Sequence, residues 1–237
     1  MLYLIGLGLN SKGYSREAYE AISNADRVYV DTYTIEFPYD FSDITSQFRN
    51  KNFINVGREF VEGLGFLKEA KDKDIVLLVY GSPLVATTHS VIIKEAMEKK
   101  IKIKIFHAGS ILDAVAETGL QPYKFGKTTS IPSFEADSYA GIIKNNLKIK
   151  AHSLVLADIG LSFDNALKKL DGDCSKNGVK LDKIVVCERL GLKNSYIYYN
   201  RISKLKSIKV KAPFCFVVPG ELHFVEKEFL ESFSGAS

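Results

Sequence analysis

Two glycines near the amino terminus have the spacing of a cofactor-binding turn. Gly6 and Gly8 close the apolar run from Leu2 to Leu7, and paired glycines allow a tight turn and a close backbone approach to a ligand. A dinucleotide fingerprint needs a third glycine where this chain has Ser11, although Asp31 stands where a nicotinamide enzyme contacts a ribose. The pattern therefore leaves two readings open, a nicotinamide-binding turn and an ordinary turn after a buried strand.

Two further loops combine glycine with small polar residues. Gly81 to His89 reads GSPLVATTH and follows the aliphatic run from Ile75 to Tyr80, and His107 to Ile111 reads HAGSI and follows Ile101 to Phe106. In an open α/β sheet, ligands bind beyond the carboxyl ends of the strands, where helix starts offer unpaired N–H groups. These two loops and the first glycine turn are therefore the candidate binding loops.

Four histidines are candidate proton acceptors: His89, His107, His152 and His223. None has a paired carboxylate at a spacing that can be read from the sequence, and a histidine at a helix start or strand end is more often a hydrogen-bonded structural residue. We therefore predict no catalytic residue from the sequence.

The cysteines do not indicate a metal site. Cys174, Cys187 and Cys215 are widely spaced, form no C-x-x-C pair and have no histidines at metal-ligand spacing. We expect reduced thiols in a cytoplasmic protein without a bound metal.

The elements that must position these loops alternate along the chain. Strand-like runs followed by helical patterns predict an α/β fold. We expect two α/β domains, residues 1–109 with a mainly parallel sheet and residues 110–237 with a mixed sheet. In the first domain we expect strands at Leu2 to Leu7, from Arg27, at Ile75 to Tyr80 and at Ile101 to Phe106, and helices after Ser15 as N-cap, at Glu59 to Lys71 and at Thr87 to Lys99. A further helix, with Ser110 as N-cap, is expected directly after the domain boundary.

The second half has its own set of expected elements. Several of its strands are expected to pair antiparallel. The strands are Thr128 to Ile131, Ser153 to Ala157, Ile184 to Cys187, Tyr196 to Tyr199 and Phe214 to Val218, and the helices are Tyr139 to Lys148, Asp164 to Leu170 and Leu222 to Ser232.

Composition places the chain among ordinary globular proteins. It has 237 residues, 46% of them apolar and 25% charged, with a net charge of +4, which is close to the globular average. No apolar run approaches the ~20 residues that span a bilayer. The basic segment from Lys204 to Lys211 is expected to be a solvated face, although a nucleic-acid patch would look the same. We expect no membrane and no nucleic-acid partner.

Six strings together resemble a known family. MLYLIGLGLN, GSPLVATTH, HAGSI, YKFGK, LADIG and VVPGELHFVE occur in an order and spacing that resemble the diphthine synthase family, which belongs to the tetrapyrrole-methylase class of methyltransferases. The resemblance covers almost the whole chain. It implies two α/β domains of the tetrapyrrole methylase type with S-adenosyl-L-methionine in the cleft between them and S-adenosyl-L-homocysteine as product.

The resemblance also implies the residues that contact this cofactor. Their contacts are expected to be mainly main-chain and apolar, which suits a flat adenine and a sulfonium that must not meet a competing nucleophile. The first three loops supply five of them and the second domain supplies three. They are Leu9, Ser82, Val85, Ser110, Ile111, Ala157, Leu190 and Phe214.

One of these positions departs from the family pattern. The family usually has Gly-Asp-Pro where this chain has Gly81-Ser82-Pro83, so a hydroxyl replaces a carboxylate. A charge-assisted hydrogen bond is worth about 1.5–3 kcal/mol and a neutral one about 1 kcal/mol, so we expect roughly tenfold weaker cofactor binding.

The resemblance implies elongation factor 2 as the substrate. The acceptor is the amine of a 3-amino-3-carboxypropyl group on a histidine of that factor. An α-amino group has a pKa of about 7.7–8.0, so deprotonating it at pH 7 costs only about 1–1.4 kcal/mol. Holding nitrogen and methyl carbon in line supplies roughly 7–11 kcal/mol. We therefore expect positioning to dominate, and we expect a homodimer, as is common for soluble enzymes.

Three alternatives remain open. A precorrin or uroporphyrinogen methyltransferase would have the same fold, but VATTH and VPGELH argue against it. A nicotinamide-dependent oxidoreductase is favoured only by Gly6, Gly8 and Asp31. A cofactor-binding regulatory protein without activity is favoured by the missing carboxylate at Ser82.

Overall fold

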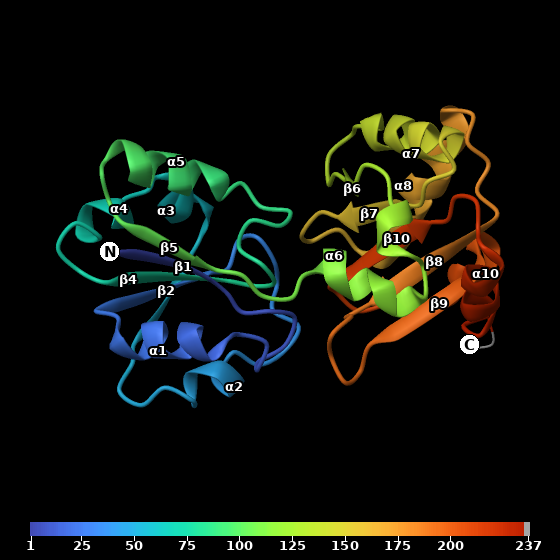
Figure 1. Ribbon diagram of the computed structural model, residues 1–237. Helices are drawn as coiled ribbons and strands as arrows, with labels where there is room; N and C mark the ends of the chain where they lie inside the picture. The colour runs from blue at the N-terminus through green and yellow to red at the C-terminus, as the bar shows by residue number, and fades with distance from the viewer. Residues whose placement is uncertain (235–237) are drawn as a thin grey trace. The chain divides into compact units, whose positions relative to one another are not determined.

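The computed structural model describes residues 1–234, and the chain divides into two compact units, Met1–Ile111 and the chain from Leu112 onward. The first unit contains a five-stranded parallel sheet in the order β3-β2-β4-β1-β5 (Figure 1). Its strands are β1 (Leu2–Gly6), β2 (Arg27–Asp31), β3 (Phe53–Val56), β4 (Ile75–Val79) and β5 (Ile103–Phe106).

Helices cover both faces of this sheet (Figure 1). The hydroxyl of Ser15 accepts a hydrogen bond of 3.1 Å from the backbone N–H of Ala18, so the predicted N-cap is confirmed. The helices are α1 (Arg16–Asn24), α2 (Ser42–Thr45), α3 (Arg58–Glu62), α4 (Phe66–Glu69) and α5 (Ser90–Glu98).

The central strand β4 is buried on both sides. Leu77 packs in a core with Leu4 and with residues of α3, α4 and α5. Its neighbour Leu78 packs in the opposite core with Ile5 and with residues of α1. Because successive strand residues point to opposite faces, a strand covered on both sides must be apolar throughout, as this one is.

The second unit contains a mixed sheet in the order β6-β7-β10-β8-β9. β6 and β7 are parallel, and the remaining pairs are antiparallel. The expected mixture of directions is therefore confirmed. The strands are β6 (Thr129–Ile131), β7 (Ser153–Ala157), β8 (Lys183–Glu188), β9 (Tyr196–Arg201) and β10 (Phe214–Val218).

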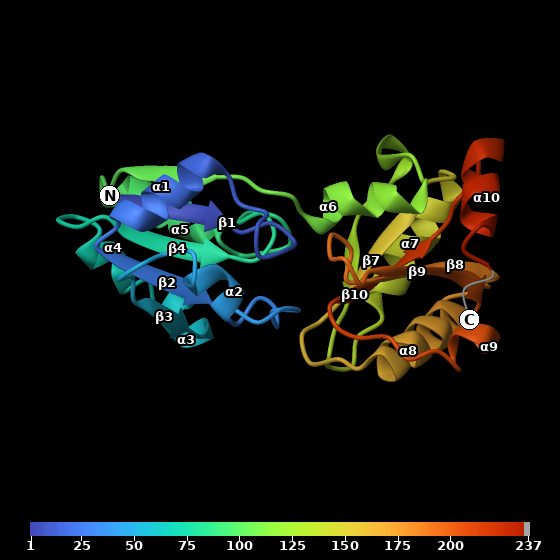
Figure 2. The same cartoon turned by 90° about the horizontal axis from the view of Figure 1, so that it is seen from below.

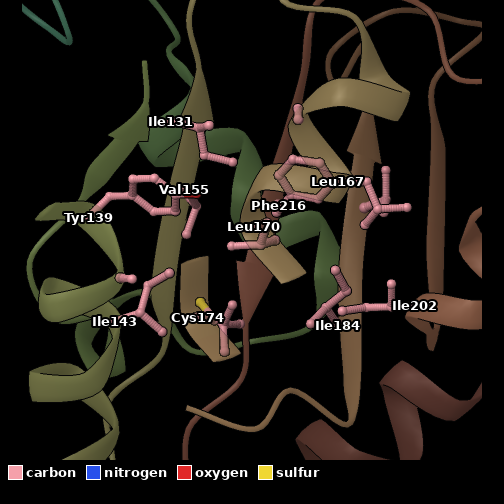
Figure 3. Packing of buried hydrophobic residues seen from close by; sticks show 14 of the residues in the cluster. Ile131, Tyr139, Ile143, Val155, Leu167, Leu170, Cys174, Ile184, Ile202 and Phe216 are labelled. Carbon is pink, nitrogen blue, oxygen red and sulfur yellow. The ribbon is translucent and has the colours of Figure 1, made fainter. Parts of the chain in front are cut away.

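Helices also lie on both sides of the second sheet, with α8 on one side and α6 and α10 on the other (Figure 2). Tyr139 and Leu170, from the helices α7 and α8, pack against Val155 and Phe216 of the sheet (Figure 3). The helices are α6 (Ile111–Ala114), α7 (Ser138–Lys148), α8 (Phe163–Lys176), α9 (Ile202–Leu205) and α10 (Phe224–Glu231), with short 3₁₀ turns η1 (Val115–Thr118) and η2 (Pro122–Lys124).

Some predicted boundaries were wrong for local reasons. The single helix expected from Glu59 to Lys71 is two short helices, because Leu64 between two glycines adopts a positive φ of 55°. The helix expected from Thr87 begins at Ser90, since the hydroxyl of Thr87 donates instead to the carbonyl of Pro83. The helix expected to end at Leu170 continues to Lys176.

Two elements of the first unit were not predicted, β3 and α2. Both are four residues long, so neither shows enough of a periodic pattern to be recognised. Over residues 1–234, no helix is long and apolar enough to span a bilayer.

Candidate functional site

The three candidate loops of the first unit converge on Gly6. A Cβ atom at this position would lie 2.6 Å from the carbonyl oxygen of Gly81, 2.9 Å from Cδ of Pro83 and 3.1 Å from Cβ of Ala108. Only glycine allows the loops after β1, β4 and β5 to approach this closely. The carboxyl edge of the parallel sheet therefore brings together the three segments that the sequence singled out.

Backbone hydrogen bonds fix two of these loops to each other. The N–H of Gly8 donates to the carbonyl of Gly81 at 3.1 Å, and the N–H of Gly81 donates back to Gly8 at 2.9 Å. Both residues have a φ of +71°, a conformation that disfavours any side chain. The hydroxyl of Tyr80 then donates to the carbonyl of Leu9 at 3.1 Å, which orients the next peptide of the loop.

Five of the predicted cofactor contacts lie in these loops. Ser82 and Ser110 are buried at 6% and 4% exposure, so their polar groups are held inside the loops. The N–H of Val85 donates to the carbonyl of Ser82 in a turn of 3.1 Å. Leu9 follows the glycine turn, and Ile111 is the first residue of α6.

The other three predicted contacts lie at one end of the second sheet. Phe214 begins β10 and pairs with Glu188, the last residue of β8. The register that pairs Cys215 with Leu156 brings Ala157, at the end of β7, beside Phe214. The N–H of Arg189 donates to Pro213 at 2.9 Å, so Leu190 follows directly from the same end. The antiparallel arrangement therefore collects segments that are far apart in the sequence.

Polar groups organise this end of the second sheet. Glu188 is 4% exposed and accepts hydrogen bonds from the N–H of Lys211 at 3.1 Å and from Tyr198 at 3.4 Å. Oδ2 of Asp158 accepts from the N–H of Ser133 at 3.0 Å, which ties the segment after β6 to the end of β7. Sequence reasoning did not single out Glu188, because its partner segments lie more than twenty residues away or on another strand.

Asp31 and His89 form a buried pair of side chains in the first unit. Oδ2 of Asp31 lies 3.2 Å from Nε2 of His89, and both side chains are at most 1% exposed. Asp31 also accepts hydrogen bonds from Tyr33 and Thr34, and Nδ1 of His89 lies 3.1 Å from the carbonyl of Pro83. Asp31 is buried and accepts these hydrogen bonds, so it is not free to contact a ribose, whereas Nε2 of His89 is buried without a hydrogen-bond partner among the described residues. The support that Asp31 lent to a nicotinamide enzyme is therefore removed.

His152 belongs to a second buried network. Nδ1 of His152 accepts a hydrogen bond of 2.9 Å from Gly220, so Nε2 carries the proton and donates to Glu226 at 3.2 Å. Glu226 also accepts from Lys124 and from the N–H groups of Gln121 and His223. Burial by itself raises the pKa of Glu226, but these hydrogen bonds outweigh burial and lower the pKa to about 2.

The two remaining histidines differ from each other. Nδ1 of His223 accepts a hydrogen bond of 3.4 Å from Val225 and caps α10, with Glu226 completing the capping box. His107 follows β5, and its side chain is exposed. Within residues 1–234 its ring has no hydrogen bond or ion pair.

The YKFGK segment lies at the other end of the second sheet. The sequence leaves two roles open for Tyr123, Phe125 and Lys127, lining of a substrate mouth and local packing. Phe125 packs edge-on against His152, with ring centroids 5.4 Å apart. The side-chain amide of Asn146 accepts a hydrogen bond from the backbone N–H of Lys127 and donates one to its carbonyl. These contacts give Phe125 and Lys127 a structural role, and lining of a substrate mouth stays a prediction.

The converging loops suit a sulfonium cofactor. Leu7 to Ser11, Gly81 to His89 and His107 to Ile111 contain no carboxylate, thiol or amine, and their two imidazoles, His89 and His107, stand at the loop ends. They offer peptide groups and apolar side chains, which do not compete for an activated methyl group. Across the described residues, no three His, Cys, Asp or Glu side chains are grouped as metal ligands.

Comparisons with known proteins agree with these features. The tetrapyrrole (corrin/porphyrin) methylase family matches residues 1–206. A diphthine synthase of Methanococcus maripaludis is 34% identical over 98% of both chains, and one of Staphylothermus marinus is 36% identical over 90% of this chain and 85% of its own. A crystal structure of diphthine synthase superposes with a TM-score of 0.90 at 34% identity, covering 98% of this chain and 95% of that one.

A more distant structure has the same fold. A putative diphthine synthase from Entamoeba histolytica superposes with a TM-score of 0.89 at 28% identity, over 100% of this chain and 99% of that chain. The expected resemblance and the two-unit α/β fold are confirmed, and a nicotinamide-dependent oxidoreductase is excluded as the family. The chain belongs to the tetrapyrrole (corrin/porphyrin) methylase family.

Proposed function

We propose that this methyltransferase transfers methyl groups from S-adenosylmethionine to the amine of a 3-amino-3-carboxypropyl group carried by a histidine of elongation factor 2. The observation that carries the proposal is similarity to diphthine synthases over 98% of both chains. The matching fold and the three loops converging on Gly6 support it. The diphthamide pathway is then its biological setting.

The cofactor is held, in this proposal, mainly by peptide groups and apolar side chains. Leu9, Val85 and Ile111 belong to loops that glycine packing and reciprocal hydrogen bonds fix at the carboxyl edge of the first sheet. Ala157, Leu190 and Phe214 share one end of the second sheet. When bound, S-adenosylmethionine supplies an electrophilic methyl group and leaves as S-adenosylhomocysteine.

Ser82 takes part with its hydroxyl in place of the carboxylate usual in the family. The side chain is 6% exposed and lies between Gly81 and Pro83, where the first two loops meet. A neutral donor or acceptor contributes less than a charged one. We expect binding to be weakened by roughly tenfold and not lost.

Positioning of the acceptor is the main contribution of the protein. The amine attacks as a neutral base, and an α-amino group is readily deprotonated near pH 7. Holding nitrogen and methyl carbon about 3–3.5 Å apart and in line can lower the barrier by roughly 7–11 kcal/mol. A fixed backbone cradle is suited to this task.

Two measurements test the proposal. Calorimetry with S-adenosylmethionine and with NAD is expected to detect binding of the first alone, and binding of NAD alone would contradict a methyltransferase. Incubation with labelled cofactor and carboxypropylated elongation factor 2 is expected to label the factor. If uroporphyrinogen or a precorrin is labelled and the factor is not, the substrate is a tetrapyrrole. If the protein binds S-adenosylmethionine but labels none of these substrates, it is a regulatory protein.

The proposal includes a cytoplasmic homodimer. Elongation factor 2 acts where proteins are synthesised, so its modifying enzyme needs access to that compartment. Closed two-fold symmetry is the most common assembly of soluble enzymes. Sedimentation equilibrium is expected to give twice the chain mass of 26.4 kDa, and a single chain mass would contradict the dimer.

A further inference from the structure

His107 differs from the other three histidines in having no structural partner. His89 is held by Asp31 and Pro83, His152 by Gly220 and Glu226, and His223 caps α10. The side chain of His107 is exposed, and over residues 1–234 nothing hydrogen-bonds to its ring. A side chain that contributes so little to the fold is available for chemistry.

The position of His107 connects it to the candidate loops. It follows Phe106, which pairs with Ile5 across β5 and β1. It precedes Ala108, whose Cβ would be 3.1 Å from a Cβ at Gly6. The imidazole is therefore carried by the same edge at which the three loops meet.

His107 is also the exposed titratable side chain of these loops. Leu7 to Ser11, Gly81 to His89 and His107 to Ile111 contain one other acid or base, His89, and its side chain is buried. Lys104 of β5 pairs with Glu17 at 3.5 Å, and Asp31 is buried against His89. The ring of His107 is therefore the exposed nitrogen base of this edge.

We propose that His107 accepts the proton that the acceptor amine must lose before each methyl transfer. The inference rests on the proposed function. The ammonium gives a proton to the ring nitrogen and becomes a neutral amine. The amine nitrogen then forms a bond to the methyl carbon while the carbon–sulfur bond breaks, and the electron pair of that bond leaves with sulfur. The methylated nitrogen is again cationic, and its proton goes to His107 once the ring has released the first to water.

The test compares His107→Gln with the wild-type protein across pH. At pH 7 we expect transfer to the carboxypropylated factor to slow about 10-fold or more, at the lower end of the range for general acid–base catalysis. Near pH 9 the deficit should shrink to within about threefold, because an amine with a pKa of about 8 is then already neutral. Added imidazole should restore part of the transfer rate of His107→Ala. If the role of His107 were purely structural, imidazole would restore none of this rate.

Binding measurements separate this role from damage to the site. Affinity for S-adenosylmethionine, and affinity for the factor in the presence of S-adenosylhomocysteine, should stay within about twofold of wild type. His223→Asn, which keeps an N-cap oxygen on α10, is the matched control and should show no pH-dependent deficit.

Each other outcome contradicts the role of His107. An unchanged pH profile in His107→Gln, or a deficit that is the same at every pH and resists imidazole, would overturn it while leaving the proposed function intact. A wild-type protein that binds the cofactor and never labels the factor contradicts the proposed function itself, and the role of His107 with it.

Discussion

His152 donates a hydrogen bond of 3.2 Å from Nε2 to Oε1 of Glu226, and both side chains are at most 1% exposed. Lys124 contacts the other oxygen of this carboxylate at 2.5 Å. Lys124 belongs to the YKFGK segment, His152 directly precedes β7, and Glu226 belongs to the GELHFVE segment. The network therefore joins two of the strings that resemble the family, about a hundred residues apart in the chain.

Replacing Glu226 should strongly destabilise the second unit. Glu226→Gln removes the negative charge and leaves Lys124 and His152 partly unpaired in a buried setting. Breaking a buried charged network typically costs about 3–5 kcal/mol. Urea denaturation measures the loss. Glu228→Gln, an exposed change on the same helix, should alter stability by less than about 0.5 kcal/mol, and equal effects of the two variants would contradict the network's role.

Acid should destabilise the fold in two stages. Burial lowers the pKa of His152 from 6.5 despite the opposing effect of Glu226, so the unfolded chain takes up a proton first as the pH falls below about 6.5. The lowered pKa of Glu226, about 2 against 4.5 in the unfolded chain, gives stability that is present above pH 4.5 and lost as the pH falls towards 2.

Thermal unfolding between pH 8 and pH 3 measures this dependence. We expect the melting temperature to fall below pH 6.5 and to fall further below pH 4.5. The lowered pKa of Glu226 corresponds to about 3 kcal/mol in the free energy of unfolding. Because Glu226→Gln lacks this contribution, its melting temperature should fall less below pH 4.5. A variant with the same acid dependence as the wild-type protein would refute the assignment to Glu226.

Gly6→Ala should damage the candidate site from within. The new Cβ would lie 2.6 Å from the carbonyl of Gly81, which is backbone and cannot rotate away. Overpacking of this kind costs about 1–3 kcal/mol and should separate the loops. Calorimetry is expected to show at least tenfold weaker binding of S-adenosylmethionine. Gly57→Ala, with no atom within 4 Å of the added Cβ, should bind like the wild-type protein.

Restoring the family carboxylate should strengthen cofactor binding. Ser82→Asp replaces a neutral hydrogen bond by a charge-assisted one, a gain of about 1 kcal/mol or roughly five- to tenfold in affinity. Ser82→Ala should weaken binding by a similar or smaller factor. Calorimetry at low and high salt measures both, and unchanged affinity in both variants would show that Ser82 does not contact the cofactor.

Much of the fold could be predicted because burial imposes a local pattern. The run from Ile75 to Val79 is apolar at every position since both faces of β4 are covered, and the bounds of β7 and β10 match those expected. The break at Leu64 and the late start of α5 depend on a positive φ and on a side chain bonded to Pro83. The periodic spacing of apolar residues in the sequence indicates neither feature.

The site was predictable only in part for a related reason. Loops after consecutive parallel strands share an edge by topology, so the convergence at Gly6 followed from the order of elements. The contact between Asp31 and His89 and the hydrogen bonds of the buried Glu188 and Glu226 involve residues distant in the sequence. Spacing carries no information about such partners.

Methyl transfer to the modified histidine is the central claim, and mass spectrometry of the factor tests it most directly. Elongation factor 2 carrying the 3-amino-3-carboxypropyl group is incubated with the protein and S-adenosylmethionine, and the peptide containing the modified histidine is analysed. We predict a mass increase of one or more methyl groups, located on the amine of that side chain. A peptide of unchanged mass, recovered with intact cofactor, would contradict the account.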